Sequence, residues 1–231
     1  MRVLTLIAMV ALMAAPLATA DIHSAKAQGI ETGAAGSFRL PVTSMRERPF
    51  QSVIMQQYDF SCGAAAIAML LTHHYGIAST EQEVFTSMYE NGDQANIQQY
   101  GFSFLDMKSY IERIGMKADG FELTLDEVLK LGVPAIALID LKGYSHFVLI
   151  KGIKDNRVLL GNPAAGMMAM SREQFEEIRQ PVVLIVRSKA TVGRKHFNQT
   201  ADWGVKPEAP VGNGRAAGTS TMFVDMFGNN F

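Results

Sequence analysis

The segment from Cys62 to Tyr75 is almost entirely apolar, with alanine, methionine and leucine recurring along it. A helix that is apolar all the way round is stable only when it is buried on every side. The segment therefore predicts a central helix around which the rest of the chain packs. Because a polar loop precedes it, Cys62 is expected at the N-terminal end of this helix.

Helical signals dominate the first half of the chain and strand signals the second. Overlapping capping boxes at Ser79 and Thr80 predict a short helix to about Tyr89, followed by a loop over residues 91–102. Further helices are predicted at 103–114, after Thr124 and after Ser171, and strands at 116–123, 134–140, 146–153, 156–162 and 181–187. Helices followed by consecutive antiparallel strands predict an α+β fold.

Both ends of the chain differ in composition from its middle. Residues 1–20 have one basic residue, a short apolar run and Ala18-Thr19-Ala20, the pattern of a secretory signal peptide. We therefore expect a periplasmic or otherwise exported protein, with an N-terminal extension at 21–45 and one domain at 46–188. Residues 189–231 shift to glycine, asparagine, proline and alanine and are predicted to be a tail outside the main core.

Charge and composition limit the classes of partner. Removing residues 1–20 takes away Arg2 and leaves 20 basic and 22 acidic residues, a net charge of −2. This balance predicts neither a nucleic acid nor an anionic membrane as partner. No later stretch reaches the roughly 18 apolar residues of a membrane span. The histidines, cysteine and acidic residues lack metal-ligand spacing, so no metal or cofactor is predicted.

Cys62 is the only cysteine, so an internal disulfide is excluded. It is either a small buried hydrophobe or a nucleophile. Its place between a polar loop and a helix favours the nucleophile, because the macrodipole and a neighbouring imidazolium would lower the pKa of the thiol.

Three further residues complete the candidate site. Gln56 is a candidate oxyanion donor together with the backbone N–H of Cys62, although most loop glutamines are merely solvated. If residues 146–162 form a hairpin turning at 154–156, Asn162 lies two residues from the position opposite His146. It could then orient the imidazole toward Cys62. The alternatives are a core histidine with an ordinary partner and a turn asparagine before Pro163.

This pattern resembles the papain-like peptidases that remove double-glycine leader peptides, the bacteriocin-processing family. The matching features are Gln56, Cys62-Gly63 with the alanine-rich run, His146 with its aliphatic neighbours, and Asn162-Pro163. The resemblance covers about residues 50–187 and implies a papain-like fold, with a helical half packed on an antiparallel sheet. The family usually has Asp where this chain has Ser61 and Asn162.

The resemblance implies a stand-alone, exported thiol endopeptidase that cuts after a small pair such as Gly-Gly. Its substrate would be a peptide or protein, such as a leader peptide or a secreted fibre subunit. One alternative is a non-cleaving binding or chaperone module of a secretion system. Another is an acyl transferase on the same scaffold.

Overall fold

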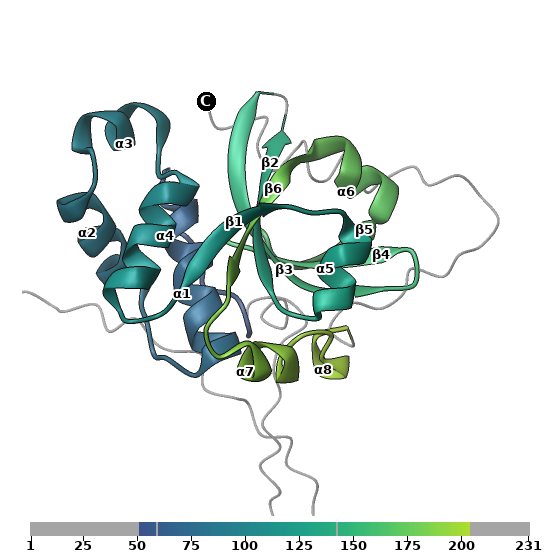
Figure 1. Ribbon diagram of the computed structural model, residues 1–231. Helices are drawn as coiled ribbons and strands as arrows, with labels where there is room; N and C mark the ends of the chain where they lie inside the picture. Colours follow the sequence, from purple (N-terminus) through teal and green to yellow (C-terminus); the bar gives the residue numbers. More distant parts are fainter. Residues whose placement is uncertain (1–50, 59, 142, 204–231) are drawn as a thin grey trace, which may run out of the picture. The chain divides into compact units, whose positions relative to one another are not determined.

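The helix predicted from the apolar run is present as α1, Cys62–Tyr75, and is buried along almost its whole length. The structure is a computed structural model that describes residues 51–58, 60–141 and 143–203. The expected signal peptide and N-terminal extension lie outside these residues. Helices α1, α2 (Glu81–Asn91) and α4 (Phe104–Arg113) share one core with one face of the sheet (Figure 1).

The predicted caps form, but the loop predicted at 91–102 is wrong. Capping boxes Thr80–Glu83 and Ser103–Asp106 begin α2 and α4. Between these helices lies α3, Gln94–Tyr100, where the side chain of Asp93 accepts the backbone N–H of Asn96. Ile97 is the single buried side chain of α3, so the sequence there lacks the apolar periodicity from which a helix is predicted.

The second half of the chain forms a six-stranded antiparallel sheet in the order β1-β6-β2-β3-β4-β5. The strands are β1 Ala118–Glu122, β2 Ala135–Leu141, β3 Tyr144–Lys154, β4 Arg157–Asn162, β5 Gly166–Ser171 and β6 Arg179–Val186. Edge strand β5 was not predicted, because glycine, alanine and methionine carry little strand propensity and its pairing with β4 decides its conformation. The α+β prediction, with helices packed on an antiparallel sheet, is confirmed.

The two faces of the sheet bury separate cores. Phe147 and Leu149 of β3 face α1, whereas Val148 and Ile150 belong to the core that also holds α5 (Leu125–Leu131) and α6 (Arg172–Ile178). This alternation is the period of two expected of a strand buried on both faces. The central strand β3 is therefore fixed on either side.

A β-bulge interrupts the pairing of β3 with β4. Lys154 pairs with Arg157 and Gly152 with Leu159, but the register then shifts so that Ile150 pairs with Leu160. The extra residue is Lys151. A bulge inserts one residue into one strand and changes the face that later residues present to their neighbours.

The expectation that residues after 188 form a tail outside the core differs from the structure over residues 190–203. This segment, here called the C-terminal strap, holds α7 (Ala190–Lys195) and α8 (Thr200–Trp203). Phe197 is buried in the core on the β3 face of Val148. The amide N–H of Asn198 donates to the bulge carbonyl of Lys151 (2.9 Å). Residues 204–231 lie outside the described part.

An ion pair also joins the strap to the bulge. The side chain of Lys151 is 1% exposed, and its Nζ lies 3.3 Å from Oδ2 of Asp202 and donates to the carbonyl of Ser52 (3.1 Å). The Ser52 hydroxyl donates to the other carboxylate oxygen of Asp202 (3.1 Å). A buried ammonium is tolerated only with such a partner.

We expect Asp202→Asn to lower the free energy of unfolding by about 3 kcal/mol, because removing one partner leaves a buried charge uncompensated. Asp126→Asn is the matched control, since Asp126 is 80% exposed in its ion pair with Arg172. The control should change stability by less than about 1 kcal/mol. Urea unfolding of the two variants measures the difference, and equal effects would contradict a structural role for the strap.

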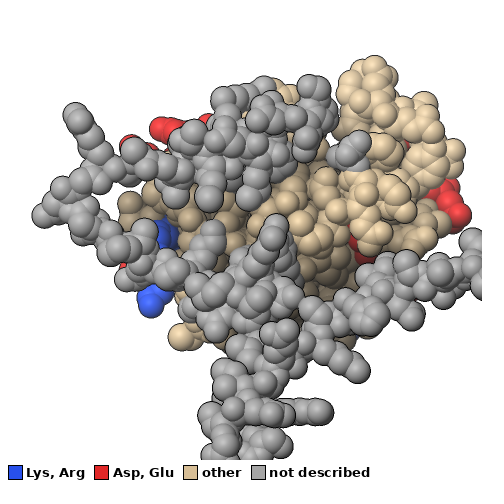
Figure 2. Space-filling view, turned by 180° about the vertical axis from the view of Figure 1, so that it is seen from behind, with Lys and Arg blue, Asp and Glu red and all other residues tan. Residues whose placement is uncertain are grey.

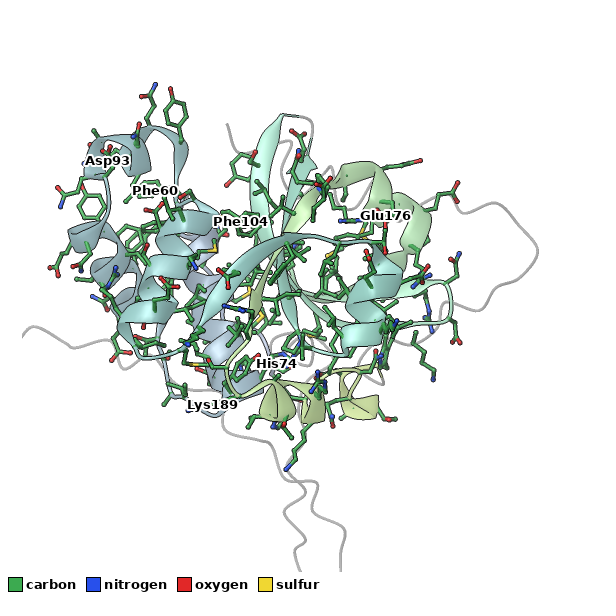
Figure 3. All side chains as sticks on the ribbon, in the orientation of Figure 1. Phe60, His74, Asp93, Phe104, Glu176 and Lys189 are labelled. Carbon is green, nitrogen blue, oxygen red and sulfur yellow. The ribbon has the colours of Figure 1, made fainter. Side chains whose placement is uncertain are left out.

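A second prediction concerns acid stability. His74 of α1 lies beside the strap (Figure 3), its ring centroid 6.4 Å from that of His196. Burial lowers the pKa of His74 from its ordinary value to about 3. As the pH falls below about 6.5, the unfolded chain binds this proton and the folded chain does not. Stability should therefore fall by about 1.4 kcal/mol per pH unit in this window from His74 alone.

Unfolding of the wild type, His74→Gln and His196→Gln, each measured at pH 7 and pH 5, isolates this contribution. The exposed His196 serves as the comparison, because its variant keeps the buried histidine and removes only a lesser influence on the pKa of His74 than burial. We expect the pH dependence of stability to be weaker in His74→Gln alone. Identical pH dependence in all three proteins would refute the assignment.

Candidate active site

Cys62 is the first residue of α1, and its side chain is almost fully buried. The backbone N–H groups of Phe147, Gly63 and Cys62 itself act on its sulfur in the direction that lowers the pKa of the thiol. Gly63 lets the start of α1 pack closely against Phe102 and Met107, because a Cβ there would lie 2.6 Å from Cε of Met107 and 3.3 Å from Cβ of Phe102. The thiol therefore lies beside β3 at Phe147, the residue after His146.

His146 and Asn162 are joined directly. Nε2 of His146 lies 2.8 Å from Oδ1 of Asn162, and both side chains are fully buried. The bulge makes this possible, since the shifted register, extended by one pair, places Asn162 opposite Val148, two residues from His146. The diagonal contact agrees with the sequence prediction, but the turn is shorter than the expected 154–156, because Lys154 pairs with Arg157, and the bulge makes up the difference.

Two further contacts fix the orientation of the Asn162 amide. Its Oδ1 also accepts the backbone N–H of Ala164 (2.9 Å), and its Nδ2 points to the sulfur of Met168 (3.6 Å). Because Oδ1 can only accept, Nε2 of His146 must carry the proton in this bond. The neutral imidazole then has its lone pair on Nδ1, the nitrogen available to act as a base.

Burial opposes charge on both members of the pair. It raises the pKa of the Cys62 thiol, and the backbone N–H bonds from Phe147, Gly63 and Cys62 offset this in part. Burial also lowers the pKa of His146, against the hydrogen bond that its Nε2–H donates to Asn162, which raises it. The expected lowering of the thiol pKa is therefore wrong for the resting site. Both shifts favour the uncharged form of their group, the thiol of Cys62 and the neutral imidazole of His146.

Gln56 lies in the loop before α1 and is tied to the Asn162 end of β4. Its backbone N–H donates to the carbonyl of Pro163 (3.0 Å), and its side-chain Nε2 donates to the carbonyl of Tyr58 (3.2 Å). Its Oε1 is buried with no hydrogen-bond partner among the described residues. To donate to an oxyanion, Nε2 has to release Tyr58.

Two residues of this site had no role in the sequence prediction. The hydroxyl of Ser61, directly before Cys62, bonds to the carboxylate of Glu81, and both side chains are buried. Glu81 lies among the capping residues at the start of α2, where polar residues are expected, so no separate role could be assigned to it from the sequence. The sequence could have indicated a role for Glu81 only because an acidic side chain stands next to the apolar segments that pack α1 against α2.

A cysteine at a helix N-terminus and a histidine held by an asparagine form the constellation of papain-like cysteine peptidases. The chain belongs to the peptidase C39 family, whose model matches residues 51–191. This agrees with the resemblance to the bacteriocin-processing peptidases found in the sequence and with the papain-like fold.

Two curated relatives are described as a probable functional amyloid protease, FapD. The Pseudomonas fluorescens protein is 40% identical over 134 residues, which cover 58% of this chain and 59% of that protein. The Pseudomonas aeruginosa protein is 38% identical over 145 residues, covering 63% and 64%. The chain thus matches less than two thirds of the length of these relatives.

A solved structure of a double glycine motif protease from an AMS/PCAT transporter, in complex with the leader peptide, is also similar. It is 25% identical with a TM-score of 0.49 and covers 58% of this chain and 89% of that one.

Residues 51–58, 60–141 and 143–203 hold neither a metal-binding cluster nor a membrane-spanning helix. No three histidine, cysteine or acidic side chains there are grouped to hold a metal ion. None of the helices described is both long and apolar enough to cross a bilayer. On the face shown in Figure 2, the described surface has few charged side chains and no concentration of lysine and arginine.

The reactivity of Cys62 toward iodoacetamide tests the electrostatics of the pair. An ordinary thiol titrates at about pH 8.5. Because the thiolate is the reactive form, a raised thiol pKa should place the half-maximal alkylation rate above that pH. Asn162→Asp should move the midpoint to lower pH, because a buried carboxylate favours the imidazolium and hence the thiolate. A rate that levels off below pH 7 in the wild type would contradict the neutral resting pair.

The control is Asn156→Asp, at the exposed turn of the same hairpin, which adds the same charge far from the thiol. Its alkylation profile should match the wild type.

Proposed function

We propose that this chain is an exported cysteine endopeptidase that cuts a peptide or protein after a small pair of the Gly-Gly kind. The observation that carries this proposal is the hydrogen bond from Nε2 of His146 to Oδ1 of Asn162, an oxygen that also accepts the N–H of Ala164. His146 directly precedes Phe147, whose backbone N–H acts on the Cys62 thiol. A binding module has no need of a histidine held in one tautomer beside a single thiol.

The proposed reaction has two halves. Nδ1 of His146 takes the thiol proton as the sulfur bonds to the scissile carbonyl carbon. The backbone N–H of Cys62 and Nε2 of Gln56 bind the resulting oxyanion. The C–N bond then breaks, and the leaving amine takes the proton from His146. Water, deprotonated by Nδ1, attacks the thioester carbon and releases the carboxylic acid and the thiol.

Asn162 holds His146 in place through both halves. It accepts from Nε2 whether the ring is neutral or protonated, so the ring keeps one orientation while Nδ1 gains and loses its proton. Its amide is uncharged and therefore stabilises the imidazolium less than a carboxylate would. This residue is expected to set the rate rather than the type of reaction.

The proposed substrate follows from the relatives and the sequence. The signal-peptide pattern of residues 1–20 supports action in the cell envelope. The two Pseudomonas proteins are described as probable functional amyloid proteases, which supports a secreted fibre subunit or another component of its secretion system as substrate. The resemblance to double-glycine leader peptidases supports small residues at the cleavage point.

A protein comprising residues 21–231 should cleave a synthetic Gly-Gly peptide after its second glycine. Mass spectrometry of the products measures the cleavage point. A matched peptide with Val-Val should stay intact, because branched side chains fill space that glycine leaves free. Binding of both peptides without cleavage would instead support the alternative of a non-cleaving module.

Site variants test the catalytic unit. Cys62→Ala and the double change with His146→Ala should be equally inactive, because members of one unit are not additive. Asn162→Ala should lose less activity, and Asn162→Asp should retain it, since the carboxylate accepts the same bond. Loss of turnover in a folded Asn162→Asp protein would refute the role of Asn162.

A further inference from the structure

The loop before α1 connects the two groups proposed to bind the oxyanion. Gln56 stands at its start, and the N–H of Cys62 follows its end. Between them a turn is closed by Tyr58 and Ser61, where the N–H of Ser61 donates to the carbonyl of Tyr58 (3.2 Å) and the N–H of Tyr58 donates to the Ser61 hydroxyl (3.2 Å). The separation of the two donors therefore depends on the conformation of this turn.

The carboxylate of Glu81 forms hydrogen bonds at both ends of this turn. Its two carboxylate oxygens accept the N–H of Gln57, at 2.9 Å and 3.1 Å, next to Gln56. One of these oxygens also accepts the hydroxyl of Ser61, next to Cys62. A single side chain is thus bonded to the neighbour of each proposed oxyanion donor.

The position of Glu81 is itself rigid. It is the first residue of α2, whose start is held by the Thr80–Glu83 capping box, and α2 packs against α1 in the same core. Glu81 is 2% exposed and Ser61 is fully buried, so water is not a ready substitute for either partner. Aromatic contacts add to this support, since Tyr58 and Phe60 both lie against Phe85 of α2, with ring centroids 5.5 Å and 5.9 Å apart.

We propose that Glu81 is a positioning residue that sets the geometry of the oxyanion-binding loop through Gln57 and Ser61. The proposal rests on the peptidase function proposed above and names a residue outside the Cys62, His146, Asn162 and Gln56 set. The hydrogen bonds of Glu81 go to Gln57 and Ser61, the neighbours of the two proposed oxyanion donors, so its effect should fall on the stabilised oxyanion and not on the nucleophile.

Glu81→Gln should lower kcat for the Gly-Gly peptide by about 10- to 100-fold, because small misplacements of catalytic groups have effects of this size. KM should change little, since the loop acts on the transition state. Ser61→Ala should give a smaller loss. The double variant should lose less than the product of the two single losses, because both residues belong to one network. Glu83→Gln is the matched control on the same helix, since glutamine also closes a capping box, and its kcat should equal that of the wild type.

Two reagents separate the loop from the nucleophile. Iodoacetamide alkylates Cys62 without forming an oxyanion, so its rate should be the same in Glu81→Gln and wild type. A peptide aldehyde ending in Gly-glycinal reacts differently. The sulfur bonds to the aldehyde carbon and the thiol proton passes through His146 to the oxygen, which occupies the oxyanion site as a hemithioacetal. Glu81→Gln should weaken inhibition by this aldehyde by the same factor as kcat.

The outcomes are distinct. A kcat and an aldehyde affinity within about threefold of the wild type in Glu81→Gln would overturn the positioning role while leaving the peptidase function in place. Equal losses of alkylation and turnover would also overturn it, because they report damage to the thiol or the fold. If the wild type neither cleaves the peptide nor binds the aldehyde, the peptidase function itself fails, and the role of Glu81 fails with it.

Discussion

The single extra residue in β3 is the constraint on which most of this structure depends. A regular ladder continued from the Lys154–Arg157 pair would set Asn162 opposite Leu149, on the other face of the sheet from His146. The bulge at Lys151 changes that parity and brings the two polar side chains together. It also frees the Lys151 carbonyl for Asn198 and directs its ammonium to Asp202. One irregularity therefore organises the candidate site and anchors the C-terminal strap.

Gly152 shows how closely the strap approaches the bulge. A Cβ at this position would lie 2.3 Å from the side-chain oxygen of Asn198, so only glycine lets the two segments meet. The strap is thus packed and hydrogen-bonded against β3 as part of the domain. The carboxylate it brings, Asp202, is paired with the ammonium of Lys151, whereas the candidate catalytic histidine is held by an uncharged amide. The site is consequently organised by hydrogen-bond geometry, with little electrostatic bias toward an ion pair.

Sequence reasoning was most successful where a local pattern and the tertiary structure agree. The all-apolar run predicted α1, and the polar residues near 154–156 predicted the hairpin that brings His146 to Asn162, although the bulge that completes this contact was not foreseen. It failed where distant contacts decide the outcome. β5 is a strand because β4 pairs with it, and the strap is ordered by the bulge carbonyl and a buried lysine. The direction of the thiol pKa reversed because burial, which a sequence does not display, outweighs the helix terminus. Glu81 was missed because its partners lie 20 and 24 residues away along the chain.

The single cysteine has a consequence for redox chemistry. With no second thiol in the chain, the fold contains no disulfide that a reductant could break. By the same fact, a sulfenic acid formed on Cys62 has no resolving cysteine within the molecule, so only an external thiol can return it to the reduced state. In an oxidising compartment the fold and the nucleophile would thus respond independently to oxidants. Folding needs no oxidation, while recovery of an oxidised Cys62 depends on a reductant supplied from outside.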